Sequence, residues 1–129
     1  MTHYLLVLSS FLLLLNFALI RNKLLSALLL ANFATSIAFW MNPIQKSFLH
    51  TVDSFFAKLS LLAFTVYMMF IKGATSRDRF LYVLVLSFTV IMAFFSNISS
   101  RSEWACTGHI LCHFVFHIFA NIGLFVIFS

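Results

Sequence analysis

The sequence has few charged residues for its length. Of its 129 residues only 9% are charged, with eight Lys and Arg and three Asp and Glu. A soluble domain needs about 25% charged residues to cover its surface. The chain is also 63% hydrophobic and has 18 Phe, which excludes a disordered chain, because such chains are polar and poor in aromatics. The composition therefore predicts an integral membrane protein, with residues 1–129 forming one domain.

Cysteine and proline are also scarce. Cys106 and Cys112 lie six residues apart, which on a helix is about 9 Å of rise and exceeds the ~7 Å Cα limit of a disulfide. We therefore expect them to be small apolar residues of a buried helix rather than a redox pair. The single proline, Pro43, lacks an amide hydrogen and is expected at a helix boundary.

The net charge of +5 does not indicate nucleic-acid binding. The basic residues stand in ones and twos between apolar runs and form no patch. Basic residues placed in this way anchor helix ends at lipid headgroups and set the topology. We therefore expect no nucleic-acid partner. Membrane lipids are the expected partners, with other membrane subunits or a second copy of the chain left open.

Long apolar runs predict the fold, because a membrane helix needs about 20 apolar residues. The first run has no basic segment before it and no small-residue cleavage site after it, so we expect a retained helix rather than a signal peptide. The prediction is an all-α bundle of about five transmembrane helices, at 4–20, 24–41, 52–71, 79–95 and 104–128. Polar loops are expected at 73–78 and 96–103.

Basic loop residues predict the orientation, since they favour the cytoplasmic side. The loops after the first and third predicted helices carry five of them: Arg21, Lys23, Lys72, Arg77 and Arg79. The other side carries Lys46 and Arg101, and Lys58 lies inside a span. We therefore expect the N-terminus outside and the C-terminus in the cytoplasm. The sequence does not indicate which membrane is spanned.

The last predicted helix carries three histidines in register. His109, His113 and His117 are spaced by four residues, so they share one helix face, and Asn121 extends the row. Two histidines four residues apart can chelate one metal ion, but His109 and His117 are separated by about 12 Å of rise. The row therefore predicts either part of a metal or cofactor site, completed from other helices, or interhelical hydrogen bonds.

Further ligands are expected at the start of the third predicted helix. His50 and Asp53 are three residues apart and share a helix face. The topology places them on the same side of the membrane as the start of the last helix. Lys58 is an alternative partner for Asp53, but a spacing of five is unfavourable on one helix. We therefore expect one polar site near the outer side, with His50 and His109 as additional candidate metal ligands.

Three short motifs follow one another along the chain: Ser36-x-x-x-Trp40, Asp53 at the start of a helix, and His113-x-x-x-His117 in the last helix. In this order they resemble the CREST superfamily of membrane proteins, which includes alkaline ceramidases, progestin and adiponectin receptor relatives and GPI-lipid remodelling proteins. The resemblance implies zinc bound by His113 and His117, with Asp53 and Ser36 acting on water or an oxyanion. The family has more helices, and its third zinc-binding histidine is Trp40 here.

These residues fit three functions. The first, which we predict, is a zinc (Zn)-dependent intramembrane hydrolase in which metal-bound hydroxide attacks a lipid amide or ester, with Asp53 as general base and Ser36 at the oxyanion. The second is a membrane anchor or electron-transfer subunit that binds haem b between His50 and a histidine of the last helix. The third is a non-catalytic accessory or proton-relay subunit.

Overall fold

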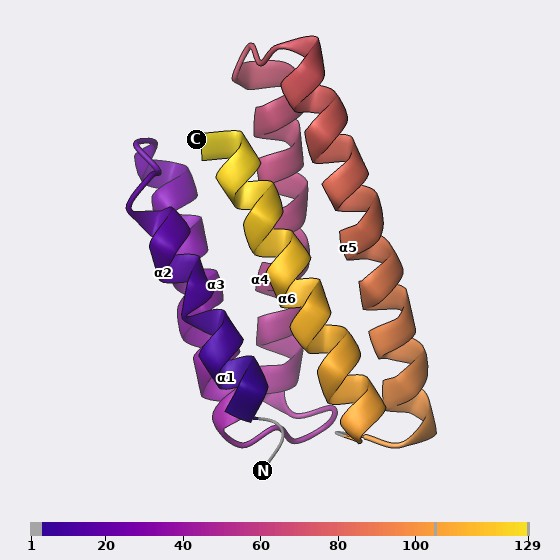
Figure 1. The fold of residues 1–129 in the computed structure, drawn as a ribbon. Helices are drawn as coiled ribbons and strands as arrows, with labels where there is room; N and C mark the ends of the chain where they lie inside the picture. Colours follow the sequence, from indigo (N-terminus) through magenta and orange to yellow (C-terminus); the bar gives the residue numbers. More distant parts are fainter. Residues whose placement is uncertain (1–3, 105, 129) are drawn as a thin grey trace.

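The computed structural model describes residues 4–104 and 106–128, and these form an all-helical bundle (Figure 1). The elements are α1 (Tyr4–Ser10), α2 (Leu12–Phe17), α3 (Lys23–Met41), α4 (Phe48–Val66), the π-helical segment η1 (Tyr67–Ile71), α5 (Ser76–Ser102) and α6 (Thr107–Phe128). Four of the described helices are long and apolar enough to cross a membrane: α3, α4 continued by η1, α5 and α6. Lengths of 19 to 27 residues rise about 28 to 40 Å, against a hydrocarbon core of ~30 Å.

Large apolar side chains cover the outside of the bundle. Leu24, Phe48 and Phe70 are 78%, 81% and 82% exposed. Soluble proteins rarely expose contiguous apolar surface of this kind, whereas lipid chains solvate it. The exposed apolar side chains and the four long apolar helices are together the features of a membrane protein.

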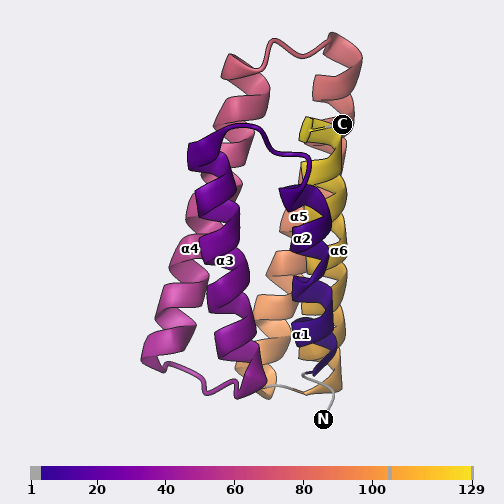
Figure 2. The ribbon, with the colours of Figure 1, turned by 90° about the vertical axis from the view of Figure 1, so that its left-hand side faces the viewer.

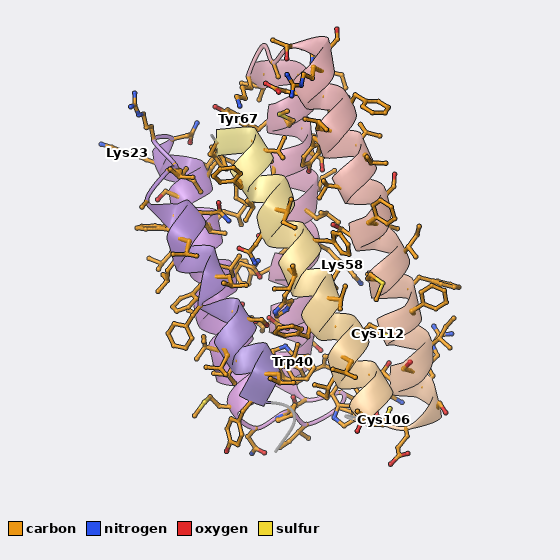
Figure 3. The ribbon with its side chains drawn as sticks, viewed as in Figure 1. Lys23, Trp40, Lys58, Tyr67, Cys106 and Cys112 are labelled. Carbon is orange, nitrogen blue, oxygen red and sulfur yellow. The ribbon has the colours of Figure 1, made fainter. Side chains whose placement is uncertain are left out.

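The long helices form two antiparallel hairpins, in which α3 packs on α4 and α5 packs on α6. The short helices α1 and α2 pack against both α3 and α6 and so connect the hairpins (Figures 1 and 2). The start of α1 and the α3–α4 and α5–α6 connections lie at the lower end of both views. The α2–α3 and α4–α5 connections and the end of α6 lie at the upper end, where Figure 3 shows Lys23. Most basic loop residues therefore lie at the upper end of the bundle. Which end faces the cytoplasm stays a prediction from the sequence.

Polar residues determine where three of the long helices begin. The Asn22 side chain accepts hydrogen bonds from two backbone N–H groups of the first turn of α3, at 2.9 and 3.2 Å. Ser47 and Thr75 cap α4 and α5 in the same way, each over 3.2 Å. Such caps satisfy N–H groups that the first helical turn leaves without partners.

The first helix, predicted as continuous at 4–20, covers Tyr4–Phe17 and is interrupted at Phe11. The hydroxyls of Ser9 and Ser10 donate to the Leu6 carbonyl, at 3.0 and 2.7 Å. The Phe11 N–H bonds to the carbonyl three residues before it, at 3.1 Å, instead of the fourth. Serine hydroxyls bonded to backbone carbonyls bend helices, and the shorter backbone bond tightens the turn. Together α1 and α2 are shorter than the ~20 residues that a membrane-spanning helix needs.

The loop predicted at 96–103 is also wrong, because α5 continues through most of it to Ser102. The Ser100 hydroxyl donates to the Asn97 carbonyl at 2.7 Å, so it bonds within the helix. Arg101 lies in the last turn, where a cation interacts favourably with the helix dipole. A polar composition therefore does not end this helix.

The remaining helix boundaries differ from the prediction by a few residues. α4 begins before 52 and α5 before 79, because Ser47 and Thr75 cap them earlier. α6 begins at Thr107 instead of 104, and the Cys106 sulfur accepts the His109 N–H at 3.3 Å. The two cysteines were expected within a buried helix, but Cys106 precedes α6 and both side chains are only half-buried.

Side-chain contacts join the two hairpins at the upper end. The hydroxyls of Thr65 on α4 and Tyr82 on α5 are 2.7 Å apart and share a hydrogen bond. The Lys72 ammonium, just after η1, donates to the Ile127 carbonyl in the last turn of α6. This contact satisfies one of the carbonyls that a helix leaves unpaired at its end. The α4–α5 connection is thereby attached to α6.

We predict that Gly123 permits the close packing of α6 on α5. A Cβ atom at this position would lie 3.5 Å from Tyr82 Cε2 and 3.7 Å from Val85 Cγ1, so alanine fits in van der Waals contact, and we expect a leucine side chain to press against these two residues. Gly123→Leu should lower the free energy of unfolding by about 1 to 3 kcal/mol, measured by unfolding in detergent. Gly123→Ala should remain close to wild type.

Gly108→Leu is the matched control, because Gly108 is exposed and its Cβ would meet nothing closer than 3.8 Å. An equal loss of stability in Gly108→Leu and Gly123→Leu would contradict the predicted role of Gly123.

Candidate functional site

A cavity of about 320 Å³ lies between the two hairpins. Its size falls within the ~300 to 1,000 Å³ that is typical of small-molecule sites. The six candidate site residues all line it: Ser36, His50, Asp53, His109, His113 and His117. By their positions along α3, α4 and α6 they lie in the lower half of the bundle, with His117 at about the middle. Large apolar side chains predominate in the upper half, namely Leu13, Leu29, Leu61, Phe64, Leu124 and Ile127, and Ser60, Tyr82 and Asn121 line the cavity there too. The lining is therefore richer in ionisable side chains toward the lower end and richer in large apolar side chains toward the upper end.

The histidine row of α6 borders this cavity along one helix face. The ring centroids of His109 and His113 are 6.1 Å apart, and those of His113 and His117 are 4.8 Å apart. Asn121 continues the row and lines the same cavity. His109, His113, His117 and Asn121 therefore all lie on the side of α6 that borders the cavity.

Serines from two different helices hold two of these rings. Ser9 Oγ on α1 lies 2.7 Å from His117 Nδ1, and Ser96 Oγ on α5 lies 3.0 Å from His113 Nδ1. In both rings Nδ1 is engaged, so Nε2 is the nitrogen that has no partner in the described part of the chain. The sequence analysis missed both serines. Ser9 could have been found as a polar side chain within an apolar run, whereas Ser96 begins the segment predicted as a polar loop, where no signal distinguishes it.

Two asparagines and two more serines extend this network. Asn16 Nδ2 on α2 donates to the backbone carbonyl and to Oδ1 of Asn121, at 3.1 and 3.2 Å. Asn121 Nδ2 donates to the His117 carbonyl at 2.8 Å. The hydroxyls of Ser10 and Ser36 share a hydrogen bond of 2.7 Å between α1 and α3. Ser36, the candidate oxyanion residue, therefore lines the cavity with its hydroxyl already bonded to a neighbour.

Asp53 and Lys58 line the cavity without ion pairs. Asp53 is only 9% exposed, and its carboxyl has neither a hydrogen bond nor an ion pair with residues 4–104 or 106–128. Lys58, its alternative partner, is also unpaired within these ranges, but its side chain is exposed and lies about midway along the bundle (Figure 3). Ionisable side chains in membrane helices usually face an interior cavity and have a partner there. The two charges therefore mark this cavity as the candidate site.

Trp104 packs between the connection that precedes α4 and the start of α6. Its ring centroid is 5.1 Å from that of His50 and 4.9 Å from that of His109, and its Nε1 donates to the Pro43 carbonyl at 3.1 Å. His50 Nδ1 accepts the Lys46 N–H at 2.9 Å. His50 thus borders the cavity, but its ring is engaged by the backbone N–H of Lys46, which precedes α4, and by the indole ring of Trp104.

The described side chains form no group of three or more His, Cys, Asp or Glu placed to hold a metal ion. His113 and His117 could supply two ligands, and Trp40, at the position of the family's third ligand, packs against His113 with ring centroids 5.0 Å apart. These residues do not fit a complete zinc site, which takes three or four protein ligands. Haem between His50 and the α6 row would need space that the indoles of Trp40 and Trp104 occupy.

Comparisons with protein-family models, with curated proteins and with solved structures find no match to this chain. The resemblance to the CREST superfamily therefore rests on the three sequence motifs and stays a prediction. The fold and the site define an all-helical chain with four helices able to cross a membrane and a cavity of mixed polarity between them.

We predict that Ser96→Ala destabilises the bundle by removing the hydrogen bond to His113. Interhelical hydrogen bonds in membrane proteins contribute about 0.6 kcal/mol on average and up to about 1.7. We expect a loss within this range in detergent unfolding. The control is Ser87→Ala on the same helix, because the exposed Ser87 hydroxyl donates only to the Val83 carbonyl of its own helix, at 2.8 Å.

A double-mutant cycle with His113→Ala makes the test specific, because Ser96→Ala should cost nothing further once the ring is absent. Equal destabilisation by Ser96→Ala and Ser87→Ala, or full additivity in the cycle, would show that the hydrogen bond contributes nothing.

Proposed function

We propose that this chain is a membrane protein that binds one amphiphilic lipid in the cavity between its hairpins. The observation that carries the proposal is that ionisable side chains of the cavity lining gather toward one end and large apolar side chains toward the other. A lipid bound there places its head group among the His, Asp and Ser side chains and its hydrocarbon chain among Leu, Phe and Ile. Each part of the ligand then meets surface of its own polarity, which is how small-molecule sites orient what they bind.

The depth of the polar end suits a lipid head group. His117 lies ten residues after Thr107, the first residue of α6, which is about 15 Å along the axis. This is half of a hydrocarbon core of ~30 Å. The histidine row of α6 therefore extends over about half of such a core, and large apolar side chains predominate in the lining beyond it.

The helix packing favours entry of the lipid from the bilayer. α4 packs closely on α3, and α5 packs closely on α6, but α4 and α5 are joined mainly at the upper end. Ala57 on α4 and Ala93 on α5 line the cavity, and small side chains leave room between two helices. A hydrocarbon chain entering between α4 and α5 stays in apolar surroundings throughout.

Ala93→Phe should weaken lipid binding by filling part of the cavity. Displacing two methylene groups, at ~0.8 kcal/mol each, corresponds to about a tenfold loss of affinity. The measurement is native mass spectrometry of the protein in a neutral detergent with palmitoyl lysophosphatidylcholine and monopalmitoylglycerol. Ala27→Phe is the control, because Ala27 is exposed on α3 and does not line the cavity. A wild-type protein that forms no one-to-one complex with either lipid would overturn the proposal.

Hydrolysis of the bound lipid is the second candidate function. One observation favours it: Asp53 and the His113–His117 pair border the polar end, where an ester or amide next to a head group would lie. Asp53 and the two Nε2 atoms are then available to hold or accept a proton from water. No step is assigned to zinc, because the described residues supply no third ligand. Haem binding, proton relay and an accessory-subunit role stay predictions from the sequence.

If the chain is a hydrolase, incubation with palmitoyl lysophosphatidylcholine or an N-palmitoyl amide should release palmitate. Asp53→Asn should then lower the rate by about a hundredfold or more, as expected for loss of a general base, while the N-palmitoyl amide, which has no cationic head group, still binds. The readouts are product by mass spectrometry and zinc per chain in wild type and His113→Ala. Bound lipid recovered intact from the wild-type protein, with and without added zinc, would exclude hydrolysis of these substrates and leave the binding function.

A further inference from the structure

Two side chains of opposite charge line the cavity without pairing with each other, the buried Asp53 and the exposed Lys58. Asp53 and Lys58 both line it, and neither forms an ion pair with a described residue. They are five residues apart on α4, which separates them by about 140° around the helix and about 7.5 Å along it. The two charges therefore border the same space from different edges, and a ligand has room between them.

Two buried polar groups in the same lining lack partners. Trp40 is 2% exposed and Ser60 is 4% exposed, and both line the cavity. Neither Trp40 Nε1 nor Ser60 Oγ has a hydrogen-bond partner within the described residues. Buried polar groups in native proteins nearly always have a partner. Because the indole N–H is only a donor, its missing partner is a hydrogen-bond acceptor.

We infer that the lipid bound in this cavity carries a zwitterionic head group. This inference rests on the proposed function, since the head group binds here only if the lipid does. The cationic group of the ligand pairs with Asp53, and its anionic phosphate or carboxylate pairs with Lys58. An ester or phosphoryl oxygen accepts the Trp40 N–H.

Anionic, cationic and neutral head groups would each leave Asp53, Lys58 or both without a partner. An anionic head group would satisfy Lys58 but would be repelled by Asp53, and a cationic head group would have the reverse effect. A neutral head group would leave the buried Asp53 carboxylate without a partner, which is unfavourable, and it would offer no anion to the exposed Lys58 ammonium. Selectivity among head groups therefore follows from repulsion and unpaired charge as well as from attraction.

The test is a competition among three lipids with the same chain, followed by native mass spectrometry of the full-length protein in neutral detergent. The probes are palmitoyl lysophosphatidylcholine, which is zwitterionic, palmitoyl lysophosphatidylglycerol, which is anionic, and monopalmitoylglycerol, which is neutral. We expect the zwitterionic lipid to bind about tenfold more tightly than either of the others, the ratio typical of one charged hydrogen bond.

Two substitutions assign this preference to the two charges. Asp53→Asn should remove most of the preference for the zwitterionic over the anionic lipid, and Lys58→Gln should remove most of the preference over the neutral lipid. Glu103→Gln and Lys46→Gln make the same charge changes at exposed positions outside the cavity and should leave both preferences unchanged.

The outcomes separate this inference from the proposed function. Equal binding of the three lipids, with binding still weakened in Ala93→Phe, would overturn the zwitterion assignment and leave the lipid-binding function. Preferences that survive in both cavity variants, or that change equally in the exposed controls, would overturn it as well. Failure of all three lipids to bind the wild-type protein would overturn both. If either cavity variant does not fold, the competition on the wild-type protein decides.

Discussion

The polar row of α6 has to find its hydrogen-bond partners within the bundle, and the rest of the structure depends on this constraint. In the hydrocarbon core no water is available to satisfy a polar group, so each one needs a partner in the protein. Ser96 on α5 supplies the partner of His113, and Ser9 on α1 supplies that of His117. Asn16 on α2 does the same for Asn121. Three other helices are thereby positioned around one face of α6.

These hydrogen bonds also account for the cavity. α1 and α2 pack between α3 and α6, so the two hairpins are held apart at one side. On the other side α4 and α5 meet mainly at the upper end, through Thr65 and Tyr82. The space between the hairpins stays open because its walls are bonded to other neighbours. The unpaired Asp53 and Lys58 line this space, together with the buried Trp40 N–H and Ser60 hydroxyl, which lack partners among the described residues. These groups make a lipid head group the expected occupant.

The interruption of the first helix follows from the hydrogen bonds of two serines, and it allows this segment to pack against both α3 and α6. The sequence before Arg21 is apolar enough for a helix that crosses the membrane, and hydropathy alone predicts one. The Ser9 and Ser10 hydroxyls, however, bond both to their own backbone and to side chains of α6 and α3. A short, bent segment can follow two neighbouring helices at once, which a straight helix of the same length could not do.

The sequence by itself determined the long apolar helices, because burial in lipid requires runs of about 20 apolar residues. It also determined that His109, His113 and His117 share a face, because a spacing of four follows from helix geometry. Asp53 and Ser36 could be placed toward the same end of the bundle from the direction of their helices. Only the tertiary structure decided which groups have partners: Ser36 and the two histidine Nδ1 atoms do, whereas Asp53 does not. Partners come from helices far apart in the chain, and no periodicity within one helix specifies how another helix packs against it.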